Sequence, residues 1–235
     1  TQLARCCRPA PPDEISGFHM IYSSGTTGRP KGVVLPFTPG PIDEFNPLEG
    51  RMPFHDEVKP LVSLNVGPLY HGAPLSTMIG AHRVGGTFVT QRKFNAAGVL
   101  DAIQAYRVNV AQFVPTMFVR MLALPEEERS RYDVSSLKIV IHAAAPCPVE
   151  IKRRMIEWWG PILFEYYGST EGIGATAITS EEWLRKPGSV GRSSLGPIHI
   201  CDEEGRELPV GEPGLIYFEA PSGRAINYLN DPEKT

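Results

Sequence analysis

The residues best suited to chemistry stand close together in the stretch YSSGTTGRPKG, which runs from Tyr22 to Gly32. It combines serine and threonine hydroxyls with repeated glycines and one lysine, Lys31. Glycine loses more conformational entropy on folding than any other residue, so an ordinary surface turn has no need of so many. Hydroxyls, accessible backbone N–H groups and an ammonium together suit one kind of ligand, a polyphosphate. The stretch is therefore a candidate phosphate-binding loop.

Two common phosphate-binding patterns do not fit this stretch. A Walker A loop requires Gly-Lys followed by Ser or Thr, whereas Pro30 precedes Lys31 and Gly32 follows it. The dinucleotide-binding pattern Gly-x-Gly-x-x-Gly does not occur there either. A flexible surface turn is the alternative that these residues alone leave open.

The stretch closely resembles the phosphate-binding signature of the adenylate-forming superfamily, which includes acyl-CoA synthetases, luciferases and the adenylation domains of nonribosomal peptide synthesis. Other stretches resemble further motifs of that family, in the family's order. They are the histidine motif PLYHGAPL (68–75), the adenine-side strand end HAAAPCP (142–148), the Tyr-Gly-x-Thr-Glu motif YYGSTEG (166–172) and the entry to a β region, KPGSVGR (186–192). Within the family, EYYGSTEG and EEWLRKPGSVGR are most similar to bacterial fatty-acyl-CoA synthetases, the long-chain-fatty-acid–CoA ligases.

The resemblance implies a role for each motif residue. The catalytic residues that it implies are Lys31, Thr170 and Glu171, with Thr170 on the α-phosphate and Glu171 as the ligand of Mg2+. The nucleotide-binding residues that it implies are Ser24, Gly25, Thr26, Thr27, Gly28, Lys31, Ala144, Ala145, Tyr167, Gly168 and Thr170. The residues that it implies for the acid are His71, Ala143 and Ala144. Tyr167 is expected on one face of adenine and the backbone of Ala144 and Ala145 on the other.

The resemblance also implies the reaction, with ATP, Mg2+ and coenzyme A. A carboxylic acid, expected to be a fatty acid, attacks ATP and forms an acyl-adenylate with release of pyrophosphate; the thiol of coenzyme A then displaces AMP. Positioning and electrostatic stabilisation of phosphate charge must supply most of the catalysis.

Two alternatives to this function remain open. One is adenylation of an aryl or amino acid for a carrier protein, although YHGAPLS lacks the acidic residue with which amino-acid-activating relatives pair the substrate ammonium. The other is a non-catalytic nucleotide-binding relative, which would be expected to lose Lys31, Thr170 or Glu171.

Alternating strand and helix patterns must position these motifs. Strands are expected at residues 18–23, 61–66, 87–90, 108–114, 138–144 and 162–168, and helices at 95–106, from Pro115 onward and at 148–160. This alternation favours an α/β fold with a mostly parallel sheet flanked by helices. Shorter β-like pieces follow Lys186, with a hairpin turn at DEEG (202–205). We therefore predict an ATP- and acid-binding α/β subdomain at 1–185 and the start of a β-barrel-like subdomain at 186–235.

Composition narrows the class of protein. The 235 residues are 42% hydrophobic and carry a net charge of −3, which indicates a soluble globular protein without the basic surface of a nucleic-acid-binding protein. Cys6, Cys7, Cys147 and Cys201 have the spacing of neither a zinc site nor a disulfide framework. No apolar run reaches transmembrane length and no signal peptide is evident, so a cytoplasmic location is expected and membrane association is not signalled.

Both ends of the chain resemble cuts through a longer protein. The first residue is Thr1, and NDPEKT at the other end has the pattern of a helix start, with Asp231 as N-cap and Pro232 at the first helical position. The family's ribose-binding, hinge and C-terminal lysine residues would follow Thr235. The given chain is therefore expected to be inactive alone. Separately, its loop at residues 23–31 is expected to be mobile without ligand, because glycine and small hydroxyl residues make few buried contacts.

Overall fold

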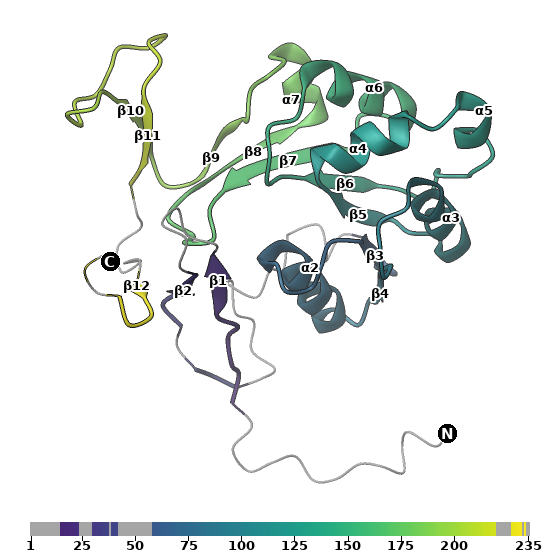
Figure 1. The fold of residues 1–235 in the computed structure, drawn as a ribbon, viewed down its shortest axis with the longest axis horizontal. Coiled ribbons are helices and arrows are strands. Elements are labelled where there is room, and N and C mark those ends of the chain that lie inside the picture. Colours follow the sequence, from purple (N-terminus) through teal and green to yellow (C-terminus); the bar gives the residue numbers. More distant parts are fainter. Residues whose placement is uncertain are drawn as a thin grey trace.

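A seven-stranded sheet forms the centre of the computed structural model, which describes residues 15–23, 30–37, 39–41, 58–219, 227–231 and 233. The strand order is β4-β3-β5-β6-β7-β8-β9 (Figure 1). The strands are β3 (Val62–Asn65), β4 (Thr87–Val89), β5 (Val110–Phe113), β6 (Ile139–His142), β7 (Leu163–Gly168), β8 (Ala175–Thr179) and β9 (Arg192–Leu195). The strands from β4 to β7 in this order pair in parallel, and β8 and β9 add antiparallel pairs. The predicted α/β fold with a mostly parallel sheet is confirmed.

Helices cover both faces of this sheet. Figure 1 shows α2 on one side of the sheet and α4, α6 and α7 on the other. The helices are α2 (Gly72–Arg83), α3 (Ala96–Tyr106), α4 (Pro115–Leu122), α5 (Glu126–Arg129), α6 (Val149–Trp159) and α7 (Ser180–Arg185). None of the helices in the described ranges combines the length and the apolar character that crossing a bilayer requires.

The two faces of the sheet contribute to two separate hydrophobic cores. Successive side chains of a strand point to opposite faces. On β5, Ala111 and Phe113 enter the larger core with Phe118 of α4, whereas Val110 enters the smaller core with Ala81 of α2. All residues of β5 are buried, as expected for a parallel strand that is covered on both faces.

Local signals in the sequence set the helix ends. The Asn95 side chain caps α3 by accepting a hydrogen bond from the Gly98 N–H at 2.7 Å. Pro115 starts α4, at a position where a backbone N–H would have no partner within the helix. α7 begins with a capping box formed by Thr179 and Glu182.

Two smaller sheets accompany the large one. Strands β1 (Ile21–Ser23), β2 (Lys31–Val34) and β12 (Asn227–Tyr228) pair antiparallel in the order β1-β2-β12. β10 (Ile198–Cys201) and β11 (Leu215–Phe218) form a two-stranded antiparallel sheet. The expected turn at residues 202–205 follows β10, and its Gly205 N–H donates to the Asp202 carbonyl at 3.1 Å. β9 still belongs to the large sheet, and the subdomain boundary at residue 186 stays a prediction.

Most expected elements appear close to their predicted bounds; α3, α6 and β7 differ from them by one residue at the ends. Among the elements that were not expected, α2 has weak apolar periodicity because the residues it buries include Pro74, Thr77 and Gly80. α7 was also missed, although Thr179 followed three residues later by Glu182 is a readable start signal.

Candidate active site

Three of the sequence motifs lie at the carboxyl edge of the parallel strands. The histidine motif follows β3, residues 143–145 follow β6, and YYGSTEG ends β7. β6 and β7 pair in parallel from Val140↔Leu163 to His142↔Glu165, so the residues after both strands leave at the same edge. β5 links β3 to β6 in the same direction. Ligands of open α/β sheets bind outside this edge. The topology thus brings together motifs that are distant in sequence.

The small sheet β1-β2-β12 stands beside this edge. A Cβ atom added at Gly72, the first residue of α2, would lie 2.7 Å from Ile21 Cδ1 of β1. A Cβ atom added at Gly172 would lie 3.6 Å from Leu35 Cδ2, one residue beyond β2. The small sheet therefore contacts both the start of α2 and the turn that follows β7.

The candidate phosphate-binding loop lies between β1 and β2 in the chain. Its residues Ser24, Gly25, Thr26, Thr27 and Gly28 lie outside the described residues, so their role and the expected mobility of the loop stay predictions. The strands that flank it are antiparallel neighbours, with Ser23 paired to Lys31. Lys31 is thus held at the start of β2, on the last residue pair before the loop.

Lys31 and Glu171 are joined through a residue that the motifs did not include, Tyr228. The Lys31 Nζ atom lies 5.0 Å from the centroid of the Tyr228 ring. The Tyr228 hydroxyl donates to Glu171 Oε1 at 2.9 Å. Desolvation, followed by the hydrogen bond to Glu171, raises the pKa of Tyr228 above its ordinary value, which keeps the hydroxyl a donor at neutral pH. Two of the three residues expected to be catalytic are therefore close in space.

The residues expected around adenine follow β6 and end β7. Ala143 is buried, whereas Ala144 and Ala145 are exposed. Ala144 has a φ of 72°, a left-handed conformation that a non-glycine residue rarely adopts and that is common at functional sites. The Tyr167 ring stacks on Phe218 of β11 with ring centroids 6.3 Å apart, and Gly168 ends the strand. The structure places these residues at the edge of two neighbouring strands; their contact with adenine stays a prediction.

His71 and Thr170 are both exposed at this edge. His71 is the residue before α2, and its ring centroid lies 4.6 Å from that of Tyr70. Thr170 lies in the turn between β7 and β8, directly before Glu171, and the Gly172 N–H closes this turn by donating to the Ser169 carbonyl at 3.1 Å. Their proposed contacts with the acid and with the α-phosphate stay predictions.

Comparison with protein families gives the relationship directly. Residues 5–226 match the family described as AMP-binding enzyme. The chain belongs to the AMP-binding enzyme family.

This AMP-binding chain is similar to plant acid–CoA ligases. It is 34% identical over 236 residues to "4-coumarate--CoA ligase" of Pinus taeda, covering 95% of the chain and 42% of that protein. It is 33% identical over 235 residues to "4-coumarate-CoA ligase 1" of Narcissus pseudonarcissus, with the same coverage. These relatives are named for an aryl acid, so the narrower likeness to fatty-acyl-CoA synthetases is not what the comparison supports. The chain spans 42% of the length of these relatives.

Solved structures agree with this relationship. The amide bond synthetase McbA from Marinactinospora thermotolerans matches with a TM-score of 0.73 and 26% sequence identity. The match covers 95% of this chain and 44% of that one. The described strands and helices therefore share the fold of that structure.

A charged cluster, Lys152, Glu165 and His142, is buried directly behind the edge of the AMP-binding fold, on the face that carries the larger core. Lys152 Nζ of α6 donates to Glu165 Oε2 of β7 at 2.5 Å and lies 5.0 Å from the centroid of the Trp183 ring. His142 Nε2 lies 3.5 Å from Glu165 Oε2, and among the described residues neither of its ring nitrogens has a hydrogen-bond partner. The side chains of Lys152 and His142 are fully buried.

Burial controls the protonation of this charged cluster. Desolvation, with a smaller effect from the charge of Lys152, lowers the pKa of His142 to about 3, so the ring is neutral at pH 7. Desolvation also lowers the pKa of Lys152, while the hydrogen bond to Glu165 opposes this change. Burial and the carboxylate of Glu165 raise the pKa of Cys147 to about 11. Cys147 is therefore a packing residue with an unreactive thiol.

A neutral network, Asn65, Thr77, Gln112 and Tyr166, lies on the other face of the sheet. The Asn65 Nδ2 and Thr77 Oγ1 atoms donate to Gln112 Oε1 at 2.9 and 2.5 Å. Gln112 Nε2 in turn donates to the Tyr166 hydroxyl at 3.2 Å. Sequence reasoning missed this network, and its only signal was a polar residue near the carboxyl end of each of the apolar strands β3 and β5.

The donor set of the candidate site suits Mg2+. No group of three or more histidine, cysteine, aspartate or glutamate side chains gathers into a metal site among the described residues. Mg2+ needs no such cage, because it is commonly bound by one or two carboxylates together with substrate phosphates and water. The Glu171 carboxylate, whose Oε1 accepts from the Tyr228 hydroxyl within the described part of the chain, fits that requirement.

Proposed function

We propose that the protein activates a carboxylic acid with ATP, forming an acyl-adenylate and then acyl-CoA, with release of pyrophosphate and AMP. The observation that carries this proposal is the proximity of Lys31 and Glu171, which Tyr228 links beside the carboxyl edge of the sheet. Lys31 and Glu171, from distant parts of the chain, both contact Tyr228 there, and Lys31 follows a glycine- and hydroxyl-rich stretch in the sequence. Few ligands other than a metal-bound polyphosphate would use all three features.

Each residue has a physical task in this proposal. The ammonium of Lys31 attracts the phosphates that the loop hydroxyls and N–H groups of residues 24–28 surround. Thr170 donates to the α-phosphate, while Glu171 holds Mg2+, which neutralises phosphate charge when it is bound. Tyr167 and the backbone of Ala144 and Ala145 flank the adenine. His71 and Ala143 line the place of the acid, close to the α-phosphate.

The class of acid divides this proposal into two candidates. The sequences at residues 165–172 and 181–192, which resemble those of fatty-acyl-CoA synthetases, favour a fatty acid. The names of the similar plant proteins favour an aryl acid such as 4-coumarate as the second candidate. Both candidates use the same adenylation chemistry, so they differ only in which acid is accepted.

Pyrophosphate exchange in the intact protein tests the proposal. We expect ATP–pyrophosphate exchange that depends on an added acid and on Mg2+, measured with fatty acids of increasing length and with 4-coumaric acid. Glu171→Gln should lower the exchange rate by about 100-fold or more, because it removes a charge that the transferring phosphate requires. Lys31→Ala should also lower the exchange rate, because it removes the ammonium that attracts the phosphates.

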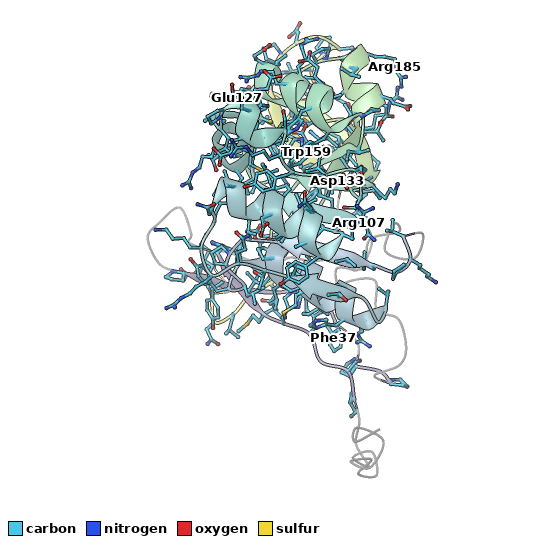
Figure 2. The ribbon with its side chains drawn as sticks, turned by 90° about the vertical axis from the view of Figure 1, so that its right-hand side faces the viewer. Phe37, Arg107, Glu127, Asp133, Trp159 and Arg185 are labelled. Carbon is cyan, nitrogen blue, oxygen red and sulfur yellow. The ribbon has the colours of Figure 1, made fainter. Side chains whose placement is uncertain are left out.

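Glu127→Gln is the matched control, because Glu127 lies on α5 at the end of the molecule away from Phe37, which follows β2 (Figure 2). It should exchange at the wild-type rate. Absence of exchange with every acid in the wild-type protein, or wild-type exchange in Glu171→Gln, would contradict the proposal.

A further inference from the structure

Tyr228 contacts both charged groups of the candidate site although no motif includes it. Its hydroxyl donates to Glu171 Oε1 at 2.9 Å, and the centroid of its ring lies 5.0 Å from Lys31 Nζ. The first contact is a hydrogen bond to an ionised acceptor, which is stronger than one between neutral groups. The second lies within the range over which an ammonium is attracted by the face of an aromatic ring. One side chain thus interacts with a cation and an anion at the same time.

The backbone fixes Tyr228 in this position. β12 pairs antiparallel with β2, with Tyr228 opposite Val33 and the Leu229 N–H donating to the Gly32 carbonyl at 2.8 Å. Lys31 lies two residues before Val33, on the same face of β2, and is therefore a diagonal neighbour of Tyr228. Diagonal neighbours on a sheet are within reach of each other when one is aromatic and the other long.

Glycine at position 32 permits this close approach. A Cβ atom added at Gly32 would lie 3.2 Å from Leu229 Cβ and 3.2 Å from Tyr22 Cε1. Such contacts are tighter than van der Waals packing tolerates without a shift of the neighbours. The glycine that follows the lysine in the phosphate-binding stretch therefore serves strand packing that holds Tyr228 beside Lys31.

We propose that Tyr228 is a positioning residue that holds the Glu171 carboxylate and the Lys31 ammonium in place for the metal-bound polyphosphate. This inference rests on the proposed function. The Tyr228 hydroxyl bonds to Oε1 of Glu171 and thereby orients the carboxylate, and among the described residues no hydrogen bond or ion pair occupies Oε2. Hydrogen bonds of this kind to metal-ligating carboxylates typically change metal affinity by about 10–100-fold. The ring supports the Lys31 ammonium at the same time and so links the metal ligand to the phosphate-binding strand.

Two substitutions separate the contributions of the hydroxyl and the ring. Tyr228→Phe removes the hydrogen bond to Glu171 and keeps the ring beside Lys31. Tyr228→Leu removes both contacts. Tyr106→Phe is the matched control, because Tyr106 is an exposed tyrosine at the end of α3 and outside the candidate site.

The readout is ATP binding by titration calorimetry in the intact protein, with Mg2+ and with EDTA. For Tyr228→Phe we expect about 10-fold weaker binding of ATP with Mg2+ and unchanged binding in EDTA. Tyr228→Leu should weaken binding under both conditions, because the support of Lys31 is lost too. In pyrophosphate exchange, the Mg2+ concentration for half-maximal rate should rise in Tyr228→Phe while the rate at saturating Mg2+ changes less. Tyr106→Phe should behave as the wild type in each measurement.

A second background tests whether the hydroxyl acts through Glu171. In Glu171→Gln, adding Tyr228→Phe should change ATP binding with Mg2+ no further. Equal binding by Tyr228→Phe and Tyr106→Phe, or equal weakening with Mg2+ and with EDTA, would overturn the inference. If the wild-type protein bound no ATP, the proposed function would fail. If Glu171→Gln weakened ATP binding with Mg2+ and Tyr228→Phe did not, only the role of Tyr228 would be refuted.

Discussion

The charged cluster and the neutral network occupy opposite faces of the same sheet. Both give buried polar groups a partner, the first through an ion pair and the second through hydrogen bonds between uncharged groups. β7 contributes to both, with Glu165 on one face and Tyr166 on the other. The charged cluster encloses a lysine, a carboxylate and a neutral histidine between α6, α7 and the sheet. The neutral network contains only amide and hydroxyl groups and lies between α2 and the sheet.

The two regions differ in the penalty for losing one hydrogen-bond or ion-pair partner. A buried charge must keep its partner, because removal of one partner leaves an uncompensated charge in a medium of low dielectric constant. A buried amide that loses its partner is left without a hydrogen bond and out of contact with water. The resulting loss of stability is smaller than that caused by an unpaired buried charge. The charged cluster should therefore be the more sensitive of the two to single substitutions and to pH.

Glu165→Gln should have the largest effect. It leaves the Lys152 ammonium buried without a counter-charge, and we expect a loss of about 3–5 kcal/mol in the free energy of unfolding, measured by urea denaturation. Combining Glu165→Leu with Lys152→Met should recover most of this loss, because replacing both members of a buried ion pair by apolar residues is often neutral. A loss no larger than that of Glu127→Gln on exposed α5 would contradict the assignment.

His142 should make the protein sensitive to acid. The ring has an ordinary pKa of 6.5 and a pKa of about 3 in the folded protein, so between these values the unfolded chain binds a proton that the folded chain does not. Stability should therefore fall as the pH falls below 6.5, by up to about 1.4 kcal/mol for each pH unit. Urea denaturation of His142→Leu between pH 7 and pH 5 should show a shallower decline than the wild type. Parallel pH profiles for the two proteins would show that the ring does not contribute.

Gln112→Leu should have an intermediate effect in the neutral network. It removes the acceptor of Asn65 and one of the two acceptors of Thr77, which also donates to the Ala73 carbonyl at 2.8 Å. We expect a loss of about 1–3 kcal/mol in the free energy of unfolding, with no added pH dependence below pH 7. Gln104→Leu, on the exposed side of α3, is the matched control; it removes one exposed hydrogen bond, from the Asp133 N–H at 2.7 Å, and should cost less because water can replace that bond. A loss equal to that of Glu165→Gln would remove the distinction between the two regions.

The surface pair of Arg107 and Asp133 should give the smallest effect. Both side chains, labelled in Figure 2, are exposed, and Arg107 Nη1 lies 2.9 Å from Asp133 Oδ2. Ion pairs of this kind are hydrated and screened by salt, so Asp133→Asn should leave the midpoint of urea denaturation almost unchanged at physiological ionic strength. If Asp133→Asn shifted the midpoint of urea denaturation as much as Gln112→Leu does, exposure to solvent would not explain the difference between surface and buried polar pairs.

The order of the elements and the place of the motifs could be predicted from the sequence. Apolar alternation and helix-end signals are local properties, and they located α3, α6 and β7 within one residue. Because the motifs follow predicted parallel strands, their convergence at the carboxyl edge follows from the topology. α2 was missed since its buried residues are small or polar, so that packing against the sheet rather than its own pattern makes it a helix.

The sequence by itself determined the residue types of the candidate site, the parallel strands that precede three of its motifs and the family to which they belong, but not strand β2, which carries Lys31. Only the tertiary structure decided which polar groups meet. Tyr228 lies far along the chain from both Lys31 and Glu171, and its role depends on the pairing of β12 with β2. The partners within the charged cluster and the neutral network likewise come from separate elements. Hydrogen bonds and ion pairs need contact within a few ångströms, and long-range strand and helix packing, rather than local periodicity, sets those distances.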